Sequence, residues 1–389
     1  MFSLLRPLPA TTLEKMYIFP NFVYHKIEGL EKLIIRITKL LQSKSIGFCL
    51  YRFPSETSFR LAIDRAYLPH DEGVLFQVSP FSSSFHAVSI SLSVVNTEFI
   101  TEAFLKTLSS VPKKKKFSLD LPKETSRSEY FERIDKYLKD IRGGKLDKAI
   151  LSRVVTVTRP HNFDVVDHFV ELSASYSQAF TYLLSHPYSG VWLGATPELL
   201  LRQQQEEIFT IALAGTQKKK EQGGYYWREK EIEEHEWVAR HIEQVMEEES
   251  YVLADKKAHK TIESGPVAHL ETAYVFRAED RKQDINALVQ KLHPTPAIGG
   301  WPVTESLACI QAYEGYDRRY YAGVLGEVDK SGQHSHLFVN LRCMQVGKDK
   351  IAIYVGGGIT AASDPEEEWE ETCVKSRTMR EKIRAIRKQ

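Results

Sequence analysis

The C-terminal stretch from Asp329 to Gln389 constrains the fold more than any other part of the chain. Apolar and polar residues alternate from Leu337 to Val346, and a shorter alternation runs from Ile351 to Val355. A period of two predicts strands that bury one face. Arg342 falls opposite the apolar residues, so we expect its side chain to project from the first strand, away from that strand's core face.

A glycine-rich segment and a helix start follow these strands. Gly356 to Gly358 predict a turn, although three glycines alone are weak evidence. Ser363 and Glu366 have the spacing of a capping box, and Pro365 suits the first turn of a helix. Backbone N–H groups in a glycine-rich turn ahead of a helix can bind carboxylate or phosphate. The segment is therefore a candidate anion-binding site.

Glu368, Glu371 and Lys375 are spaced i, i+3 and i+7, so they share one face of this helix. One reading is an exposed helix with an ordinary Glu–Lys pair. Together with Arg342 and the glycines, however, the face favours a site for a small, multiply anionic substrate and a divalent metal. Acidic ligands without a cysteine–histidine set favour Mg²⁺ over zinc.

Composition indicates a soluble globular protein. The chain has 389 residues, 42% of them hydrophobic, and a formal net charge of +1. This charge predicts neither a nucleic-acid nor a membrane partner, and no apolar run is long enough to span a bilayer. The four cysteines form no C-x-x-C, so we expect a cytoplasmic protein without disulfides. Whether residues 1–15 are native or Met16 is the start remains open.

Lys148 stands at the entrance of a predicted strand. A helix is expected from Ser126, with Glu129 at the capping-box offset, to Gly143 and Gly144. The run that follows, KLDKAILSR, leads into a β-branched strand. Lys148 is either a solvent-facing lysine at a strand edge or a general base brought into a pocket.

Two further carboxylates are candidates. Glu198 is alone among apolar residues between two predicted strands, where it either pairs structurally or acts as an acid with a raised pKa. Glu234 lies beside His235 on a long helix predicted from Trp227 to Glu249. The predicted buried stripe of that helix is Ile232, Val238, Ala239, Ile242, Val245 and Met246. A further strand with small residues is predicted from Tyr320 to Gly326.

Ten short blocks occur in a fixed order between about residues 126 and 380: KAILSR, GATPELLLR, ALAGT, KEIEEH, HLET, LHPTPAIGG, YYAGVLG, LRC, YVGGGI and EWEETCVK. In these blocks the chain resembles the chorismate-utilising enzymes, which include isochorismate, salicylate, anthranilate and aminodeoxychorismate synthases. The resemblance implies an α+β fold with two stacked, largely antiparallel sheets and helices outside. It also implies one domain, in which residues 1–125 form an N-terminal scaffold and residues 126–389 the catalytic core.

Three positions favour one branch of the family. Lys148 stands where anthranilate synthases have glutamine, and Ala214 where aminodeoxychorismate synthases have lysine. Ala297 stands where salicylate synthases usually have threonine. The resemblance thus implies isochorismate synthase, an isomerase that adds water at C2 of chorismate while the C4 hydroxyl leaves. The alternatives are a salicylate synthase and a chorismate-binding protein without turnover.

The resemblance also implies residue roles. Lys148 would be the general base and Glu198 the general acid. Metal contacts would come from Glu234, Glu371 and Glu368, with Mg²⁺ against the ring carboxylate. The implied substrate contacts are Ala214, Gly215, Thr216, Ala297, Tyr321, Arg342, Gly357, Gly358 and Lys375. His235 and His269 would be supporting residues.

No amidotransferase subunit is expected, because water and not ammonia would be the nucleophile. We expect a monomer or a weak homodimer. Whether the product serves menaquinone, siderophore or salicylate biosynthesis stays open at this point.

Overall fold

The fold is built on antiparallel strands that pair across long sequence distances. The computed structural model describes residues 24–68, 73–82, 87–115, 119–220, 224–264, 267–278 and 284–386. Residues 1–15, whose origin the sequence left open, lie outside these ranges. Within them, strands join in one hydrogen-bonded order, β10-β11-β9-β8-β13-β12-β3-β4-β2-β1-β6-β7-β14-β15-β5. Every pairing between the strands of this order is antiparallel.

The strands are β1 (Phe48–Arg52), β2 (Arg60–Ile63), β3 (Val74–Ser79), β4 (Ile90–Val94), β5 (Lys148–Thr158), β6 (Phe180–His186), β7 (Gly190–Thr196), β8 (Leu199–Gln204), β9 (Glu207–Lys218), β10 (Tyr251–Ser264), β11 (Val267–Ala278), β12 (Val324–Asp329), β13 (His334–Val339), β14 (Cys343–Val346) and β15 (Lys350–Thr360). The helices are α2 (Tyr24–Lys44), α3 (Glu102–Ser110), α4 (Arg127–Arg142), α5 (Val165–Ser175), α6 (Glu229–Glu248), α7 (Ile285–Leu292), α8 (Pro296–Gly299), α9 (Val303–Tyr313) and α10 (Pro365–Ile386). Short 3₁₀ helices span Arg65–Tyr67 and Thr97–Phe99.

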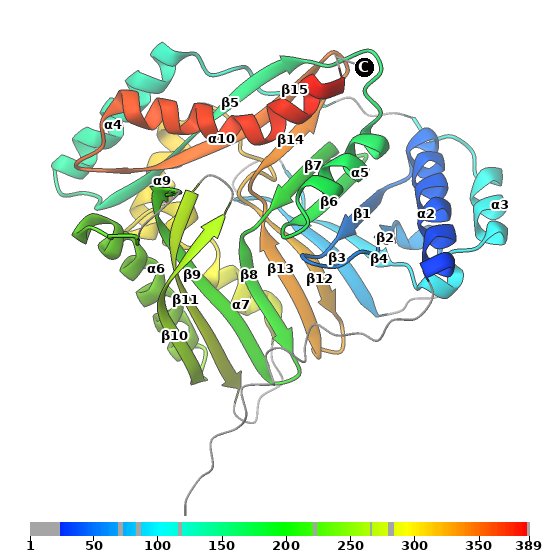
Figure 1. Cartoon of the computed structure of the whole chain (residues 1–389), viewed down its shortest axis with the longest axis horizontal. Helices are drawn as coiled ribbons and strands as arrows, with labels where there is room; N and C mark the ends of the chain where they lie inside the picture. The colour runs from blue at the N-terminus through cyan, green and yellow to red at the C-terminus, as the bar shows by residue number, and fades with distance from the viewer. Residues whose placement is uncertain are drawn as a thin grey trace, which may run out of the picture.

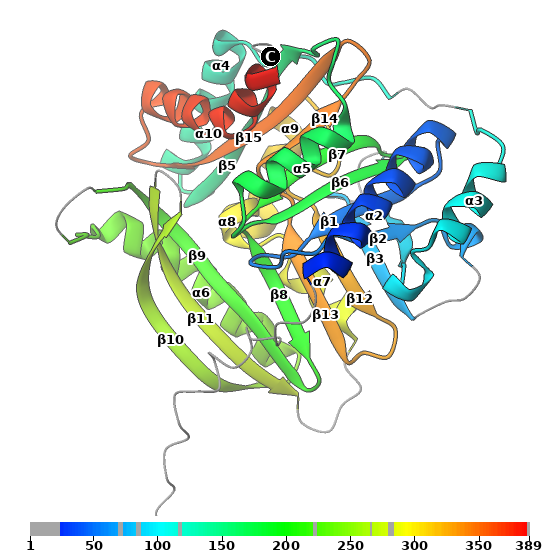
Figure 2. The ribbon, with the colours of Figure 1, turned by 45° about the vertical axis from the view of Figure 1, so that its right-hand side comes forward.

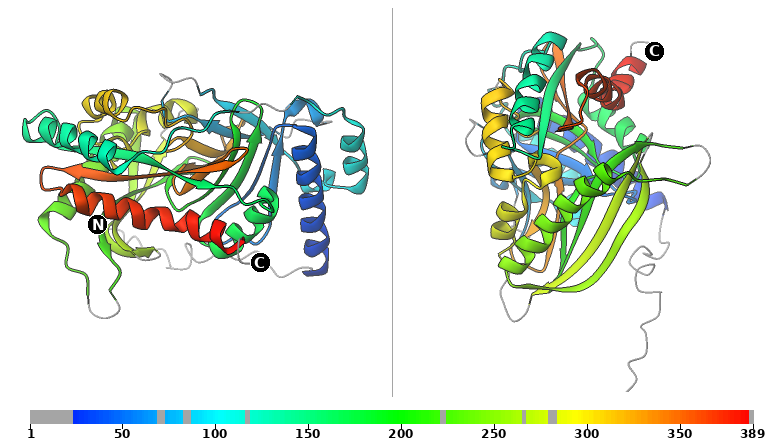
Figure 3. Two further views of the ribbon diagram at one scale, coloured as in Figure 1. Left: turned by 90° about the horizontal axis from the view of Figure 1, so that it is seen from above. Right: turned by 90° about the vertical axis from the view of Figure 1, so that its left-hand side faces the viewer.

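The expected α+β architecture with largely antiparallel strands is confirmed. The sheet curls, and helices cover it on the outside: α6 lies along β9 to β11, α4 and α10 beside β5 and β15, and α2 beside β1 (Figures 1 and 2). Seen from above, α10 runs alongside β15 and ends near α5 (Figure 3).

Side chains alternate between two buried cores. Trp192 belongs to the core that also holds Ile242 of α6, whereas its neighbour Leu193 belongs to the core that holds Ile37 of α2 and Phe169 of α5. The strands therefore have apolar residues on both faces, because helices or other strands cover both sides.

Helix α4 confirms the sequence prediction closely. Ser126 and Glu129 form the capping box, and Gly143 ends the helix. Its buried residues recur at the spacing of one helix face: Tyr130, Ile134, Tyr137, Leu138 and Ile141. Local capping signals and apolar spacing agree here, so the helix forms where both place it.

Two helix predictions need correction. Helix α10 begins at Pro365 as expected, but its cap is Asp364, which accepts from the Glu366 and Glu367 N–H groups. Ser363 instead donates from its hydroxyl to Glu368 Oε1 at 2.6 Å. On α6 four residues of the predicted stripe are buried, but Ala239 is half-buried and Ile232 is exposed. Ile232 and Ala239 are seven residues apart, so both lie at the edge of the buried face of the helix.

All four cysteines are free, as expected. Within the described ranges, none of the helices combines the length and apolar character needed to cross a bilayer.

Buried neutral histidines predict acid sensitivity. Burial lowers the pKa of His168 to about 4 and that of His336 to about 3. Below pH 6.5 the unfolded chain binds protons at these side chains and the folded chain does not, so stability falls as the pH drops from 6.5 towards 4. One such histidine costs about 2 kcal/mol between pH 6.5 and 5.

We expect His168→Leu to flatten the acid side of a plot of Tm against pH between 4.5 and 7.5. The exposed His161, changed to Leu, is the control and should leave that slope as in the wild type. An unchanged slope in His168→Leu would show that this burial does not cause the acid sensitivity.

Candidate active site

The glycine run lies inside a strand, which corrects the prediction of a turn. Gly356, Gly357 and Gly358 belong to β15 and pair with Ser152, Leu151 and Ile150 of β5. A methyl group at Gly356 would lie 2.9 Å from the Tyr321 hydroxyl, and one at Gly358 would lie 3.0 Å from Lys148 Cε. One at Gly357, on the opposite face, would lie 3.4 Å from Glu368 Oε2. The bare strand thus gives room to predicted site residues on both of its faces.

Arg342 does not project from a regular strand. The expected continuous strand breaks into β13 and β14, and Arg342 lies in the break with φ of +46°. Just before the break, the buried Asn340 donates its N–H to Gly323 O at 2.7 Å, which continues the β12–β13 pairing, and its side-chain amide to Tyr320 O at 2.7 Å. After the break the chain has other partners: β13 pairs with β12 and β8, whereas β14 pairs with β7 and β15. Burial lowers the pKa of Arg342, while Tyr321, Glu198 and Glu371 favour its charged form.

Tyr321 lies in the turn before β12, not in a strand as predicted, because β12 begins at Val324. Its ring stacks on Tyr354 with centroids 5.5 Å apart and an interplanar angle of 19°. Burial raises the pKa of Tyr321, so its hydroxyl stays a neutral hydrogen-bond donor. Gly323 follows where the backbone of Ser79 approaches closely: a methyl group at Gly323 would lie 2.2 Å from Ser79 O.

Lys148 is the first residue of β5 and is buried. Its Nζ lies 3.6 Å from Glu234 Oε2 on α6. Its backbone pairs with Trp301: Trp301 N donates to Lys148 O at 2.8 Å, and Lys148 N donates to Trp301 O at 3.1 Å. Lys148 is therefore a buried cation or amine facing a carboxylate, and not a solvent-facing lysine at a strand edge.

Glu198 lies in the turn between β7 and β8. Its carbonyl accepts from Val339 N at 2.9 Å, and its own N–H donates to Thr196 Oγ1 at 3.3 Å. Burial raises the pKa of the Glu198 carboxyl to about 7, against a smaller opposing effect of the Arg342 charge. A carboxyl that is half protonated near neutral pH suits a general acid.

Helix α10 brings its predicted face to the β15 glycines. Lys375 Nζ donates to Gly356 O at 3.0 Å and also forms an ion pair with Glu371 Oε1. A methyl at Gly357 would lie 3.7 Å from Glu371 Oε1, close to the Glu368 carboxylate on the same side. The carboxylates of Glu368 and Glu371 thus both lie close to Gly357, which has no side chain.

Ala214 to Thr216 lie near the end of β9, which continues to Lys218. Gly215 has φ of +71° and lies at a shift in register between β9 and β11. A methyl there would meet Glu231 O at 2.9 Å, so only glycine fits this bulge. His269 of β11 hydrogen-bonds Gly215 O through Nδ1 at 3.2 Å. Burial lowers the pKa of His269, and the charges of Lys375 and Arg342 lower it further.

His235 is a buried supporting residue. Its Nε2 lies 2.7 Å from Thr272 Oγ1, and burial lowers its pKa to about 4. It thus links α6 to β11 as a neutral side chain.

A cavity of about 130 Å³ lies among these residues. It is lined by Ile150, Ala297, Ile298, Arg318, Tyr321, Ala322, Leu341, Arg342, Tyr354, Val355, Gly356, Gly357, Gly358 and Lys375. The predicted substrate contacts that line it are Ala297, Tyr321, Arg342, Gly357, Gly358 and Lys375. Lys148 lies against the lining residue Gly358, and the charge of Glu198 acts on the lining residue Arg342. Ala214, Gly215 and Thr216 are not among the lining residues.

Sequence reasoning missed one charged residue of this lining, Arg318. Only its spacing from Glu314, i to i+4, could have pointed to a pair, and such pairs are common on exposed helices. Both side chains are instead 1% exposed.

The predicted metal residues lie in two places. Among the described residues, no group of three or more His, Cys, Asp or Glu side chains is arranged to hold a metal. Glu368 and Glu371 converge at Gly357, while Glu234 faces Lys148. Two carboxylates completed by waters and substrate oxygens are a usual Mg²⁺ site, so this pair fits the ion. The assignment of Glu234 to the metal stays a prediction.

Comparison with known proteins agrees with this picture. Residues 87–384 match the family described as chorismate binding enzyme. Isochorismate synthase EntC of Escherichia coli (strain K12) is 31% identical over 243 residues, which cover 60% of this chain and 62% of that protein. The salicylate biosynthesis isochorismate synthase of Pseudomonas aeruginosa is 32% identical over 275 residues, covering 67% of this chain and 56% of that protein. The matched stretches therefore span less than two thirds of these relatives.

The fold also resembles a solved structure. MenF, the menaquinone-specific isochorismate synthase of Escherichia coli, superposes with a TM-score of 0.71 at 19% identity, covering 89% of this chain and 91% of that one. Since the family match spans most of the chain and the cavity gathers the residues of its motifs, the chain belongs to the chorismate binding enzyme family.

Proposed function

We propose that the chain is an isochorismate synthase. The observation that carries the proposal is the cavity in which two cations, Arg342 and Lys375, lie close to a buried lysine and to a carboxyl with a pKa of about 7. Chorismate carries two carboxylates, which suit these cations. The names of the relatives point to the same reaction.

In the proposed mechanism, Lys148 in its amine form takes a proton from the attacking water, whose oxygen bonds to C2. The ring double bonds shift, the C4–O bond breaks, and Glu198 protonates the departing hydroxyl. One water is added and one is lost, so the reaction is an isomerisation. General acid and general base groups of this kind each contribute about 10²–10⁴-fold in rate.

Arg342 would bind the enolpyruvyl carboxylate, with the Tyr321 hydroxyl donating a second hydrogen bond. Lys375 is tied to Gly356 O and Glu371, so it would hold its charge at a fixed place beside the substrate. The bare backbone at Gly357 and Gly358 would let the substrate lie close to the strand.

Glu368 and Glu371 would hold Mg²⁺, and Ser363 fixes Glu368 through its 2.6 Å hydrogen bond. When bound, the ion would neutralise the ring carboxylate and the two glutamates. Glu234 is the proposed third contact. We further propose that the protein acts in the cytoplasm without an amidotransferase subunit.

The first test is the product. Purified protein incubated with chorismate and Mg²⁺, without ammonia, should give isochorismate and no pyruvate by chromatography. Lys148→Ala should lower kcat by at least about 10²-fold because the base is lost. Lys145→Ala is the matched control, since Lys145 is exposed and forms its ion pair with Asp140. Salicylate plus pyruvate would instead assign a salicylate synthase, and unchanged chorismate would leave the binding-protein alternative.

The second test is the pH dependence of Glu198. If its protonated form donates to the leaving group, kcat should decline above pH 7, and Glu198→Gln should lose about 10²-fold or more in kcat. A folded-state pKa raised above that of the unfolded chain costs stability as the pH rises from about 4.5 to 7. The Tm of Glu198→Gln at pH 8 should therefore exceed that of the wild type.

The control is Glu56→Gln, which removes another carboxyl whose pKa is raised by burial but which pairs with Arg60 away from the cavity. It should retain the wild-type pH profile of kcat. A Glu198→Gln enzyme with wild-type kcat would rule out the proposed acid.

The third test concerns the metal. Glu371→Gln should raise the Mg²⁺ concentration needed for half-maximal activity at least about tenfold, the loss typical when a partner of a metal site is removed. Mg²⁺ titration by calorimetry provides a second readout. Glu370→Gln, a neighbour on the same helix, is the control. Equal Mg²⁺ affinity in both variants would contradict the assignment.

A further inference from the structure

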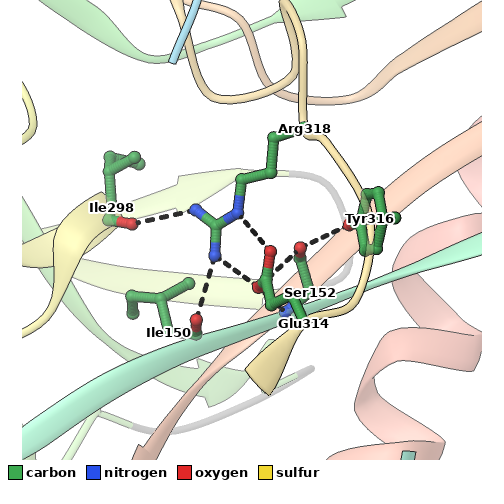
Figure 4. A network of polar contacts seen from close by, with 6 residues as sticks. All are labelled: Ile150, Ser152, Ile298, Glu314, Tyr316 and Arg318. Carbon is green, nitrogen blue, oxygen red and sulfur yellow. Dashed lines mark hydrogen bonds and ion pairs between the residues drawn. The ribbon is translucent and has the colours of Figure 1, made fainter. Parts of the chain in front are cut away.

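A buried polar network includes Arg318 of the cavity lining and joins it to β5 (Figure 4). Arg318 Nε donates to Glu314 Oε2 at 2.7 Å, and Nη2 donates to Glu314 Oε1 at 2.5 Å. Glu314 Oε1 also accepts from the Ser152 N–H at 2.7 Å and from the Ser152 hydroxyl at 2.8 Å. Tyr316 completes the network 2.5 Å from the Ser152 hydroxyl. Glu314 is thus anchored to β5.

The guanidinium of Arg318 bridges two segments of the cavity wall. Its Nη2 donates to Ile150 O at 3.0 Å, and its Nη1 donates to Ile298 O at 3.4 Å. Ile150 is two residues after Lys148 on β5, and Ile298 is adjacent to Ala297. One rigid, planar group therefore holds the segment that carries the proposed base against the segment that carries a proposed substrate contact.

The same two segments also meet at a second place. Lys148 and Trp301 exchange backbone hydrogen bonds, and Gly300 makes this approach possible. It has φ of +88°, and a methyl there would meet Lys148 O at 2.6 Å. Segment 298–301 is consequently fixed to β5 at both of its ends, by backbone bonds at Trp301 and by Arg318 at Ile298.

Stability does not account for this arrangement. Glu314 and Arg318 are 1% exposed, and both charges had to leave water. A buried ion pair is often no more stabilising than apolar residues of similar volume, because desolvation offsets the attraction. An apolar pair, however, could not donate hydrogen bonds to the carbonyls of Ile150 and Ile298 and so could not hold them at a fixed separation.

We propose that Glu314 and Arg318 are a positioning pair, which sets the distance between Lys148 and the Ala297 segment across the cavity. The inference rests on the proposed function, because Lys148 is the base of that reaction. Both residues act through the backbone of Ile150 and Ile298.

The test compares two variants designed to remain folded. Glu314→Gln with Arg318→Met removes both charges and keeps an amide oxygen for the Ser152 N–H. Arg318→Lys keeps the charge pair, but a single ammonium group lacks the fork that reaches Glu314 and two carbonyls. In both, kcat should fall about 10- to 100-fold with KM changed less than about threefold, because misplacement affects the chemical step.

Arg60→Met with Glu327→Gln is the matched control. It removes the partly buried pair of Arg60 with Glu327, and with it the pair of Arg60 with Glu56, both away from the cavity. The amide oxygen introduced by Glu327→Gln still offers an acceptor to Tyr51. This double variant should retain wild-type kcat and KM. Wild-type kcat in either Arg318 variant, with the fold verified by circular dichroism, would overturn the proposal.

Amide hydrogen exchange gives a readout that does not depend on turnover. A peptide spanning residues 295–301 should exchange at least about tenfold faster in both Arg318 variants and at the wild-type rate in the control. Unchanged exchange would overturn the positioning role. If wild-type protein failed to convert chorismate, the proposed function would fall, whereas the exchange result would still decide whether this pair fixes the segment.

Discussion

The pairing of β5 with β15 is the interaction on which the site depends. The register sets Thr360 opposite Lys148, Gly358 opposite Ile150 and Gly356 opposite Ser152. Paired residues of an antiparallel ladder point to the same face, and a slip of one residue would turn every side chain to the other. The ladder therefore fixes which groups meet: Lys148 and Tyr321 approach one side of the glycines, and α10 supplies Glu368 from the other.

Three successive glycines weaken a strand, since they bring no side chains to pack and lose more conformational freedom on folding than other residues. The ladder tolerates them because both strands continue for several paired residues beyond the glycines, with Val154 and Tyr354 buried in that part. The site therefore lies at a short part of a long ladder in which β15 has no side chains. Its polar groups approach each other across a backbone with no Cβ atoms between them.

The sequence predicts those parts of the fold whose decisive contacts are between residues close together in the chain. Helix α4 is set by local capping and spacing, and it was predicted fully. The break at Arg342 was not, because there the chain changes from the partners of β13, which are β12 and β8, to those of β14, which are β7 and β15, and these partners are far away in sequence. The glycines were read as a turn because a partner strand is invisible locally. Arg318 was missed since its burial follows only from the assembled fold.

The ends of the strand order differ in a way that bears on the protein's behaviour at high concentration. At one end, β5 is shielded at its first residue by the bridge to Trp301. At the other end, β10 exposes Val252 and Leu253, and an exposed apolar edge strand can pair with a strand of another chain. Two irregularities in its pairing, after Leu253 and after Lys257, and its lysines interrupt the regular edge that an added strand requires. The protein thereby carries its own protection against edge-to-edge aggregation.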